Sequence, residues 1–497
     1  MNKLKQFIKE HRIIVGIMSV YLVSRLWNLT LLPLFTDESI YIYWAKYIVT
    51  NQGHWFVSLT DGKPPLLIWM ISVLLSIFPS QWYLLAGRLP SVVAGTFGVG
   101  MFYLLCVELF NNKKIALLAA VLLLISPFQL FYDRMALFDG LLSSMVLASV
   151  YFALKSVRTQ RLTDAVAAGL FLGLAFLSKP TALLFVLIIP FAAFLIWTKE
   201  RRNFPRFLGL MSVYVVIGEI INNLQRLSKV YDRMELKNSQ FQQPISELLK
   251  NPFALTLGNL QGFWQWIVPY YTAPFLAVGI LAMVFLLLRN LRLGILILAF
   301  WLGPMIALAT IGREIFPRYI LFTTPYFLIP IAYLAISLWS KEKKVVKIAL
   351  LLIGGIIVLP QIAFSRALLF DPPSAPLPET ELHQYVTDHP SGYGLKEVFA
   401  FIDKESQTQH VNVVTQGTFG LYPYAFNLHY WDNNNVSVNG RWPLTTIDDD
   451  IVVMSKAGPT YLIYKEYQEL PSTLPVVTIL EVKKPGERNA LFVTKLK

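Results

Sequence analysis

The chain has 497 residues, of which 55% are hydrophobic and only 15% are charged. Soluble domains carry about 25% charged residues, so the composition excludes a water-soluble enzyme of the ordinary kind. The net charge of +13 comes from 43 Lys and Arg against 30 Asp and Glu, and residues 371–497 hold 10 of the basic and 15 of the acidic groups. The positive excess therefore belongs to the apolar part, where basic loops at one membrane face explain it better than nucleic-acid binding. The single cysteine, Cys106, excludes an internal disulfide and a cysteine-based metal site.

Apolar runs long enough to span a bilayer recur from the N-terminus to about residue 365. A span needs about 20 mostly apolar residues, which predicts about eleven crossings, at 13–32, 82–109, 115–132, 139–154, 163–178, 180–197, 207–222, 271–288, 293–311, 318–339 and 345–365. Alternate loops between these runs are rich in Lys and Arg, namely 1–12, 111–114, 155–161, 199–206, 289–292 and 341–347. The positive-inside rule makes these loops cytoplasmic. We therefore expect a cell-membrane protein with a cytoplasmic N-terminus and an external C-terminal segment.

The first external loop contains an apolar run, 66–78, that is only about half a span long. It follows Pro64 and Pro65 and ends at Pro79. If this run crossed the bilayer, most of the basic loops would move to the external side, against the positive-inside rule. We expect an interfacial or re-entrant helix here, preceded by an aromatic-rich amphipathic helix at 39–48.

The composition changes after Arg366. The proline-rich stretch 371–379 is typical of a stiff linker. Beyond it, 395–404 has helical spacing, and four segments have the β-branched and aromatic bias of strands, namely 411–415, 460–464, 476–480 and 490–494. The sequence predicts an all-α polytopic membrane domain over 1–370 and a small external α/β domain over 371–497.

Ionisable residues remain at the external ends of the predicted spans, where a charge beside apolar segments is costly. They are Asp37, Glu38, Lys63, Asp133, Arg134, Asp139, Lys179, Arg313, Glu314 and Arg318. Each has a structural alternative, because the carboxylates suit helix N-termini and the cations can extend to lipid headgroups. Those alternatives stay open for single residues. Their gathering on one membrane face predicts a site for an anionic, membrane-held substrate.

The long external segment 222–271 ends in GNLQGFWQWIVPYY (258–271), which combines amides with aromatic rings of the kind that stack on sugars. A structural aromatic belt at the membrane interface is an equal alternative. The six histidines are scattered, and only His54 lies near the ionisable residues of the first external loop. A histidine zinc site is therefore not expected.

Several segments in chain order resemble one group of membrane enzymes. The most specific are FTDESIYIYWAKYI (35–48), DGKPPLLIW (61–69) and GRLPSVVAG (87–95). They are similar to polyprenyl-phosphate-sugar-dependent glycosyltransferases of the GT-C superfamily, above all the dolichyl-phosphate-mannose protein mannosyltransferases and the lipid A aminoarabinose transferases. Weaker patterns of the same group match YDRMALFD (132–139), LSKPTALL (177–184) and FPRYILFTTPY (316–326). Ile40 departs from the pattern, since several bacterial relatives have a basic residue after the acidic pair.

The resemblance implies transfer of one sugar from a polyprenyl-phosphate-sugar donor to an acceptor hydroxyl on a glycan, lipid or protein outside the membrane. It implies Asp37 as the catalytic base, with Glu38 and Asp139 orienting the acceptor or supporting Asp37. Direct displacement by the hydroxyl would invert the anomeric configuration. Tyr41 and Tyr319 are candidate substrate contacts.

The departing phosphate needs positive charge where its negative charge develops. The candidate phosphate-binding residues are Lys63, Arg88, Arg134, Lys179, Arg313 and Arg318. Of these, Lys63, Arg88 and Arg318 match motifs of the group. A divalent metal held by Asp37, Glu38 or Asp139 stays open, because hard cations bind carboxylates but no chelating spacing is visible.

A transporter or flippase of lipid-linked saccharides is the main alternative, because it would bind the same kind of anionic lipid. Transporters usually place their charges near the bilayer midplane and contain internal repeats. Here the charges gather at one face and no repeat is visible, which favours the enzyme.

Overall fold

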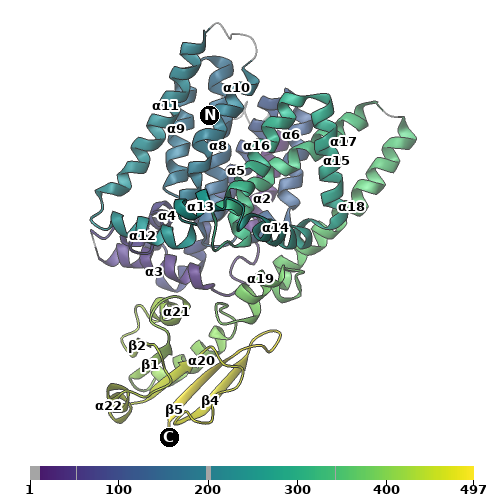
Figure 1. Ribbon diagram of the computed structural model, residues 1–497. Coiled ribbons are helices and arrows are strands. Elements are labelled where there is room, and N and C mark those ends of the chain that lie inside the picture. The colour runs from purple at the N-terminus through teal and green to yellow at the C-terminus, as the bar shows by residue number, and fades with distance from the viewer. Residues whose placement is uncertain (1–11, 52, 198–202, 342) are drawn as a thin grey trace. The chain divides into compact units, whose positions relative to one another are not determined.

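Each predicted span contains a helix in the structure, a computed structural model that describes residues 12–51, 53–197, 203–341 and 343–497 (Figure 1). These helices are α2 (Arg12–Leu26), α5 (Tyr83–Phe110), α6 (Lys113–Ile125), α8 (Phe138–Thr159), α9 (Leu162–Phe176), α10 (Leu184–Ile196), α11 (Phe204–Asn222), α15 (Ala273–Arg289), α16 (Leu291–Ile311), α17 (Thr324–Lys341) and α18 (Lys344–Phe370). Helices form in these apolar runs because a helix satisfies its own backbone hydrogen bonds away from water. The polytopic helical fold predicted from the sequence is confirmed.

The number of crossings stays a prediction. Among the described residues, six helices are long and apolar enough to cross a membrane, and a seventh span results if α14 (Thr256–Tyr271) and α15 are counted together. Those two helices bend by 107° where they meet. The predicted run 115–132 is divided, because Ser126 caps a separate short helix, α7 (Pro127–Tyr132), whose first residue is proline.

Parts of three predicted cytoplasmic loops, residues 1–11, 199–202 and 342, lie outside the described residues. The half-length run forms α4 (Leu66–Leu75), a helix of 10 residues. At about 1.5 Å per residue it is about 15 Å long, half the thickness of the hydrocarbon core. Its interfacial position stays a prediction.

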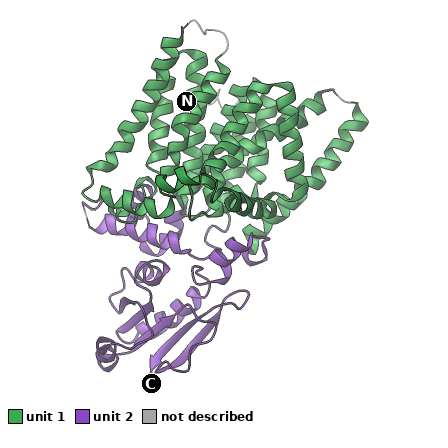
Figure 2. Ribbon diagram, viewed as in Figure 1, with its two compact units in different colours: residues 1–27, 56–67, 89–371 green, residues 28–55, 68–88, 372–497 purple. Residues whose placement is uncertain are grey.

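The first of two compact units holds most of the helices (Figure 2) and comprises residues 1–27, 56–67 and 89–371. Helix α8 is its most enclosed long helix, with 83% of its apolar window buried. Helices α9 and α11 approach closely, because Gly169 and Gly173 leave room for Ile217 and Ile221. Only 6% of the apolar window of α18 is buried, which suits a helix surrounded by lipid.

A buried polar contact holds the turn that leads into α8. The Asp133 carboxylate accepts hydrogen bonds from the Tyr21 hydroxyl and, at 2.8 Å, from Gln129 Nε2. The backbone approaches it closely, since a Cβ at Gly95 or Gly140 would lie within 3 Å of the carboxylate. This packing fixes the direction in which the first turn of α8 presents its side chains.

The second compact unit comprises residues 28–55, 68–88 and 372–497 (Figure 2). Its sheet contains β1 (Val411–Gln416), β2 (Val436–Arg441), β3 (Thr460–Tyr464), β4 (Val476–Lys483) and β5 (Ala490–Leu496), in the order β2-β1-β3-β5-β4. Strand β1 pairs in parallel with β2 and β3, and β5 pairs antiparallel with β3 and β4. Helices α20 (Leu395–Ser406), α21 (Leu421–His429) and α22 (Asp449–Ala457) accompany the sheet. The predicted C-terminal α/β fold is confirmed.

Helix α3 (Thr36–Thr50), from the loop predicted to be external, belongs to the same compact unit as this sheet. The backbone N and Oγ1 of Thr36 donate to the Pro390 carbonyl at 3.1 and 3.0 Å. The rings of Tyr43 and Tyr424 stack with centroids 4.2 Å apart. The division of the chain into 1–370 and 371–497 stays a prediction, and α3 is packed against the C-terminal part.

Candidate active site

A buried carboxylate with two cations forms where three helices of the first unit begin or end. Asp139 lies in the first turn of α8, Lys179 follows α9, and Arg318 lies in the short 3-10 helix η6 (Pro317–Thr323). Lys179 Nζ donates to Asp139 Oδ1 at 2.5 Å, and Arg318 Nε lies 3.9 Å from Asp139 Oδ2. The three side chains are between 4% and 16% exposed. We call Asp139, Lys179 and Arg318 the charge cluster.

Aromatic rings enclose the cations of the charge cluster. Lys179 Nζ lies 3.6 Å from the centroid of the Tyr319 ring, within the range of a cation–π contact. Arg318 Cζ lies 4.7 Å from the centroid of the Phe316 ring. The rings of Phe316 and Tyr319 meet at 5.7 Å. They cover part of each cation, and a less polar environment strengthens the electrostatic attraction for an anion.

Lys63 adds a third positive charge near the charge cluster. Its loop is tied to the end of α9 by a hydrogen bond from Leu66 N to Leu177 O at 2.9 Å. Burial lowers the pKa of Lys179 to about 8; the Asp139 carboxylate opposes this shift, whereas Arg318 and Lys63 reinforce it. Lys179 and Arg318 thus lie against one carboxylate, and the charge of Lys63 acts on Lys179, so the site has an excess of positive charge.

Glu38 and Arg88 form a second buried pair, in the second unit. Arg88 donates from Nε and Nη2 to the two oxygens of Glu38 at 2.8 and 2.6 Å, and both side chains are at most 1% exposed. Arg88 also donates to the backbone carbonyls of Leu29, Leu32 and Pro33. The pair therefore binds α5 to the chain that leads into α3.

Asp37 lies beside Glu38 in the first turn of α3 and is half-buried. Glu38, the third residue of the helix, accepts a hydrogen bond from the backbone N of the N-cap residue Phe35 at 3.1 Å. This bond satisfies a backbone donor at the start of α3. A negative side chain in the first turn of a helix complements the helix dipole. Tyr41, one turn further on, is buried with its ring 5.9 Å from that of Trp44.

Two of the predicted phosphate-binding residues make other contacts. Arg134 donates from Nη1 to the carbonyls of Ser24 and Trp27 at 3.2 and 2.6 Å, at the C-terminal end of α2. A cation at this end of a helix complements the helix dipole. Arg313 is exposed and donates to Glu247 at 2.8 Å.

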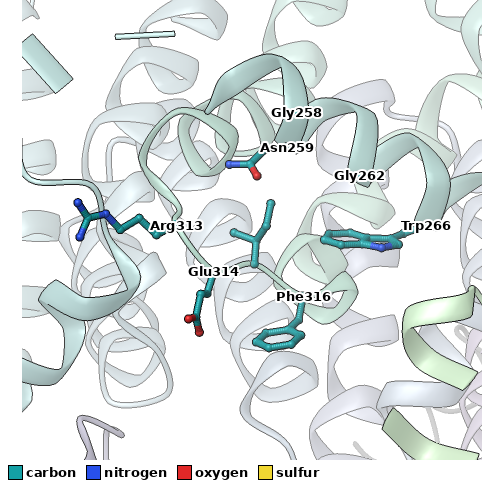
Figure 3. Close-up of a pocket in the computed structure, with 8 residues that line it drawn as sticks. Gly258, Asn259, Gly262, Trp266, Arg313, Glu314 and Phe316 are labelled. Carbon is teal, nitrogen blue, oxygen red and sulfur yellow. The ribbon is translucent and has the colours of Figure 1, made fainter. Parts of the chain in front are cut away.

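A groove of about 380 Å³ lies between α14 and the segment that precedes η6 (Figure 3). It is lined by Gly258, Asn259, Gly262, Trp266, Arg313, Glu314, Ile315 and Phe316. The α14 side belongs to the aromatic segment singled out in the sequence. The other side could not be paired with it from the sequence, because about fifty residues separate the two walls.

Among the described residues, no group of three or more His, Cys, Asp and Glu side chains could hold a metal ion. Glu38, a candidate metal ligand in the sequence, is paired with Arg88. Asp139 lies between two cations. The surroundings of these two carboxylates do not fit a divalent cation, because each carboxylate is already in contact with a side-chain cation that balances its charge.

Residues 62–221, about a third of the chain, match the sequence model of the family described as dolichyl-phosphate-mannose-protein mannosyltransferase. No curated protein matches the chain significantly. The crystal structures of ArnT from Cupriavidus metallidurans, bound to undecaprenyl phosphate and in the apo state, match with TM-scores of 0.57 and 0.58. Each match has 15% sequence identity and covers 98% of this chain and 98% of that chain.

A structure of the S. cerevisiae protein O-mannosyltransferase Pmt1-Pmt2 complex bound to the sugar donor matches with 18% identity and a TM-score of 0.37. It covers 47% of this chain and 34% of that chain, and this likeness is too slight to carry an argument. The family match and the shared fold of ArnT confirm the resemblance to GT-C glycosyltransferases that the sequence motifs indicated.

Proposed function

We propose that this protein is a membrane glycosyltransferase that moves one sugar from a polyprenyl-phosphate donor to an acceptor hydroxyl on the external side of the cell membrane. The observation that carries the proposal is the excess positive charge at the charge cluster, where Lys179 and Arg318 lie against one carboxylate and the charge of Lys63 acts on Lys179. A bound phosphate group would balance this excess of positive charge. The similarity to the mannosyltransferase family and the fold of ArnT support this assignment.

The chemistry of the leaving group explains the need for these cations. The bond from the sugar to the phosphate breaks, and the phosphate leaves as a monoester whose second pKa is about 6. It can depart as a dianion near neutral pH and requires no general acid. Lys63, Lys179 and Arg318 stabilise that dianion, since preorganised charges in a buried site act strongly on developing charge.

Asp37 is the proposed base. It accepts the proton of the acceptor hydroxyl as the oxygen attacks the anomeric carbon, and a single displacement inverts that carbon. For Glu38 and Arg88 the contacts favour a positioning role, because each already binds the other in the buried pair. Their ion pair holds the start of α3 and thereby the direction of Asp37.

The other candidates receive lesser roles in this proposal. Asp139 orients Lys179 and Arg318, and Tyr319 covers the Lys179 ammonium group. Arg134 holds the end of α2, Arg313 lies at the rim of the groove, and Tyr41 packs within α3. The mechanism has no step that requires a metal ion.

Mass spectrometry of the reaction product tests the proposal. Purified full-length protein in lipid nanodiscs is incubated with a panel of polyprenyl-phosphate sugars and candidate acceptors. Release of polyprenyl phosphate together with a glycosylated product is expected, and Lys179→Met should lower kcat/KM for the donor by at least tenfold. Lys229→Met, which changes an exposed lysine, is the matched control. Accumulation of an unmodified lipid-linked sugar in sealed vesicles, without product, would indicate a transporter or flippase instead.

A further inference from the structure

The groove beside α14 has no part in the phosphate and base chemistry proposed above. Its volume of about 380 Å³ lies in the range of about 300–1,000 Å³ that is typical of small-molecule sites. Helix α14 forms one wall, and residues 313–316 form the other (Figure 3). The lining combines two aromatic rings, an amide, two charged side chains and the bare surface of two glycines.

The two glycines keep one face of α14 open. Gly258, Gly262 and Trp266 follow one another at intervals of four residues, so they lie along the same helix face. A Cβ at Gly258 would meet nothing within 4 Å, and one at Gly262 would meet only the Trp266 ring, at 3.7 Å. Glycine is unfavourable within a helix, and no other element of the described residues comes within 4 Å of these two Cβ positions. The bare face therefore leaves room beside the indole ring of Trp266.

The polar groups at the groove suit a neutral ligand that is rich in hydroxyl groups. Asn259 Nδ2 donates to the carbonyls of Ala309 and Gly312 at 2.9 and 2.8 Å, which fixes the direction of its amide oxygen. Arg313 extends away from Trp266 (Figure 3) and is paired with Glu247. The amide oxygen can accept a hydrogen bond from a hydroxyl group, and the Glu314 side chain, whose carboxylate is directed away from Trp266 in Figure 3, supplies acceptors at the edge of the groove.

The groove adjoins the charge cluster through one ring. Phe316 lines the groove, and its centroid lies 4.7 Å from Arg318 Cζ. The sugar of the donor is bonded directly to the phosphate, so it must contact the charge cluster itself. A ligand beside Trp266 would adjoin the charge cluster through Phe316, which suits the second substrate.

We propose that this groove is the acceptor subsite and that the acceptor is a neutral saccharide whose ring packs on Trp266; this inference rests on the proposed function. The C–H face of a sugar ring matches an aromatic surface, and its hydroxyl edge matches the amide and carboxylate oxygens. In the reaction the acceptor O–H bond breaks and its oxygen bonds to the anomeric carbon. The bond from that carbon to the phosphate oxygen breaks, the proton passes to Asp37, and the polyprenyl phosphate leaves with the electron pair.

Two pairs of variants test the saccharide site without requiring turnover. Binding of short neutral oligosaccharides to the full-length protein in nanodiscs is measured by saturation-transfer NMR. Trp266→Ala removes the stacking surface and Gly262→Leu fills the groove, and each should weaken binding by about tenfold, the size expected from an aromatic contact. Trp264→Ala, at a residue 55% exposed on the same helix, and Gly209→Leu, at another helical glycine with open space, should leave binding unchanged.

Kinetics then separate this inference from the proposed function. Trp266→Ala should raise the KM for the oligosaccharide acceptor by about tenfold and leave the KM for the donor and its slow hydrolysis by water unchanged. Equal saccharide binding by the wild type and Trp266→Ala overturns the saccharide site. A raised donor KM in that variant assigns the groove to the donor, and Trp266-dependent transfer to a peptide or lipid overturns the acceptor class. If no donor reacts while saccharide binding still depends on Trp266, the proposed reaction fails and the acceptor role fails with it, but the saccharide site remains.

Discussion

The charge balance around Lys179 predicts how use of the donor depends on pH. The pKa of Lys179 is lowered to about 8, first by burial and then by Arg318 and Lys63, while Asp139 acts in the opposite direction. The donor is a phosphate diester, which carries one negative charge throughout the neutral range. Protonated Lys179 binds this charge and neutral Lys179 does not, so kcat/KM for the donor should fall as the pH rises through about 8.

The size of the fall follows from the fraction of protonated Lys179. With a pKa of about 8, about half of the enzyme is protonated at pH 8 and about a tenth at pH 9. We therefore expect kcat/KM to fall about fivefold across this interval and about tenfold for each further pH unit. Donor binding should also raise the pKa of Lys179, because the phosphate charge favours the ammonium form, so kcat should fall at a higher pH than kcat/KM.

Two variants should move this profile in opposite directions. Arg318→Gln removes a charge that lowers the pKa of Lys179, so the fall should move to higher pH; Asp139→Asn removes a charge that raises it, so the fall should move to lower pH. The assay measures donor kcat/KM by mass spectrometry from pH 6 to 10, with Lys229→Met as the control. A wild-type profile that is flat through pH 8, or two shifts in the same direction, would refute the reasoning.

Three further changes test the second compact unit. Arg88→Ala leaves the buried Glu38 carboxylate without its partner and should lower the free energy of unfolding by about 3–5 kcal/mol, seen as an earlier thermal transition that the double Arg88→Met, Glu38→Met variant partly restores. Tyr424→Ala removes the ring stacked on Tyr43; it should cost about 0.5–1.5 kcal/mol and lower kcat more than it raises the donor KM, and an unchanged kcat would show that this contact does not position α3. Burial lowers the pKa of Lys484 to about 7, against about 10.4 in an unfolded chain. The unfolded state then binds more protons between these values, so the free energy of unfolding should rise with pH from about 7 to 10, and denaturant titrations of Lys484→Met should lose this rise.

Much of the fold could be predicted because its signals are local. Long apolar runs gave a helix at each predicted span, and four strands with β-branched sequences were found where they were expected. Strand β2 was missed because its sequence, VSVNGR, is polar and only Val436 is buried at this edge of the sheet. Helix α21 was missed because Pro423 and the non-helical Tyr422 interrupt its start. Hydrophobic pattern does not reveal elements whose stability depends on their neighbours.

The sequence predicted which residues belong to the site better than it predicted which of their side chains contact one another. The motifs led to Asp139, Lys179 and Arg318, which the structure brings together. They could not show that Arg88 is paired with Glu38, because a partner fifty residues away leaves no local trace in the sequence. The motifs also did not indicate that Phe316 links the groove to the charge cluster, because the α14 wall of the groove lies about fifty residues away in the chain.

The role of Asp37 is the central claim, and it is tested most directly by measuring donor binding and sugar transfer side by side in Asp37→Asn. This change keeps the size of the side chain but removes its ability to accept a proton. The account predicts that polyprenyl-phosphate-sugar binding, measured by isothermal titration in nanodiscs, stays within about twofold of the wild type while transfer falls by at least about a hundredfold. Transfer at the wild-type rate by a fully folded Asp37→Asn protein would contradict it.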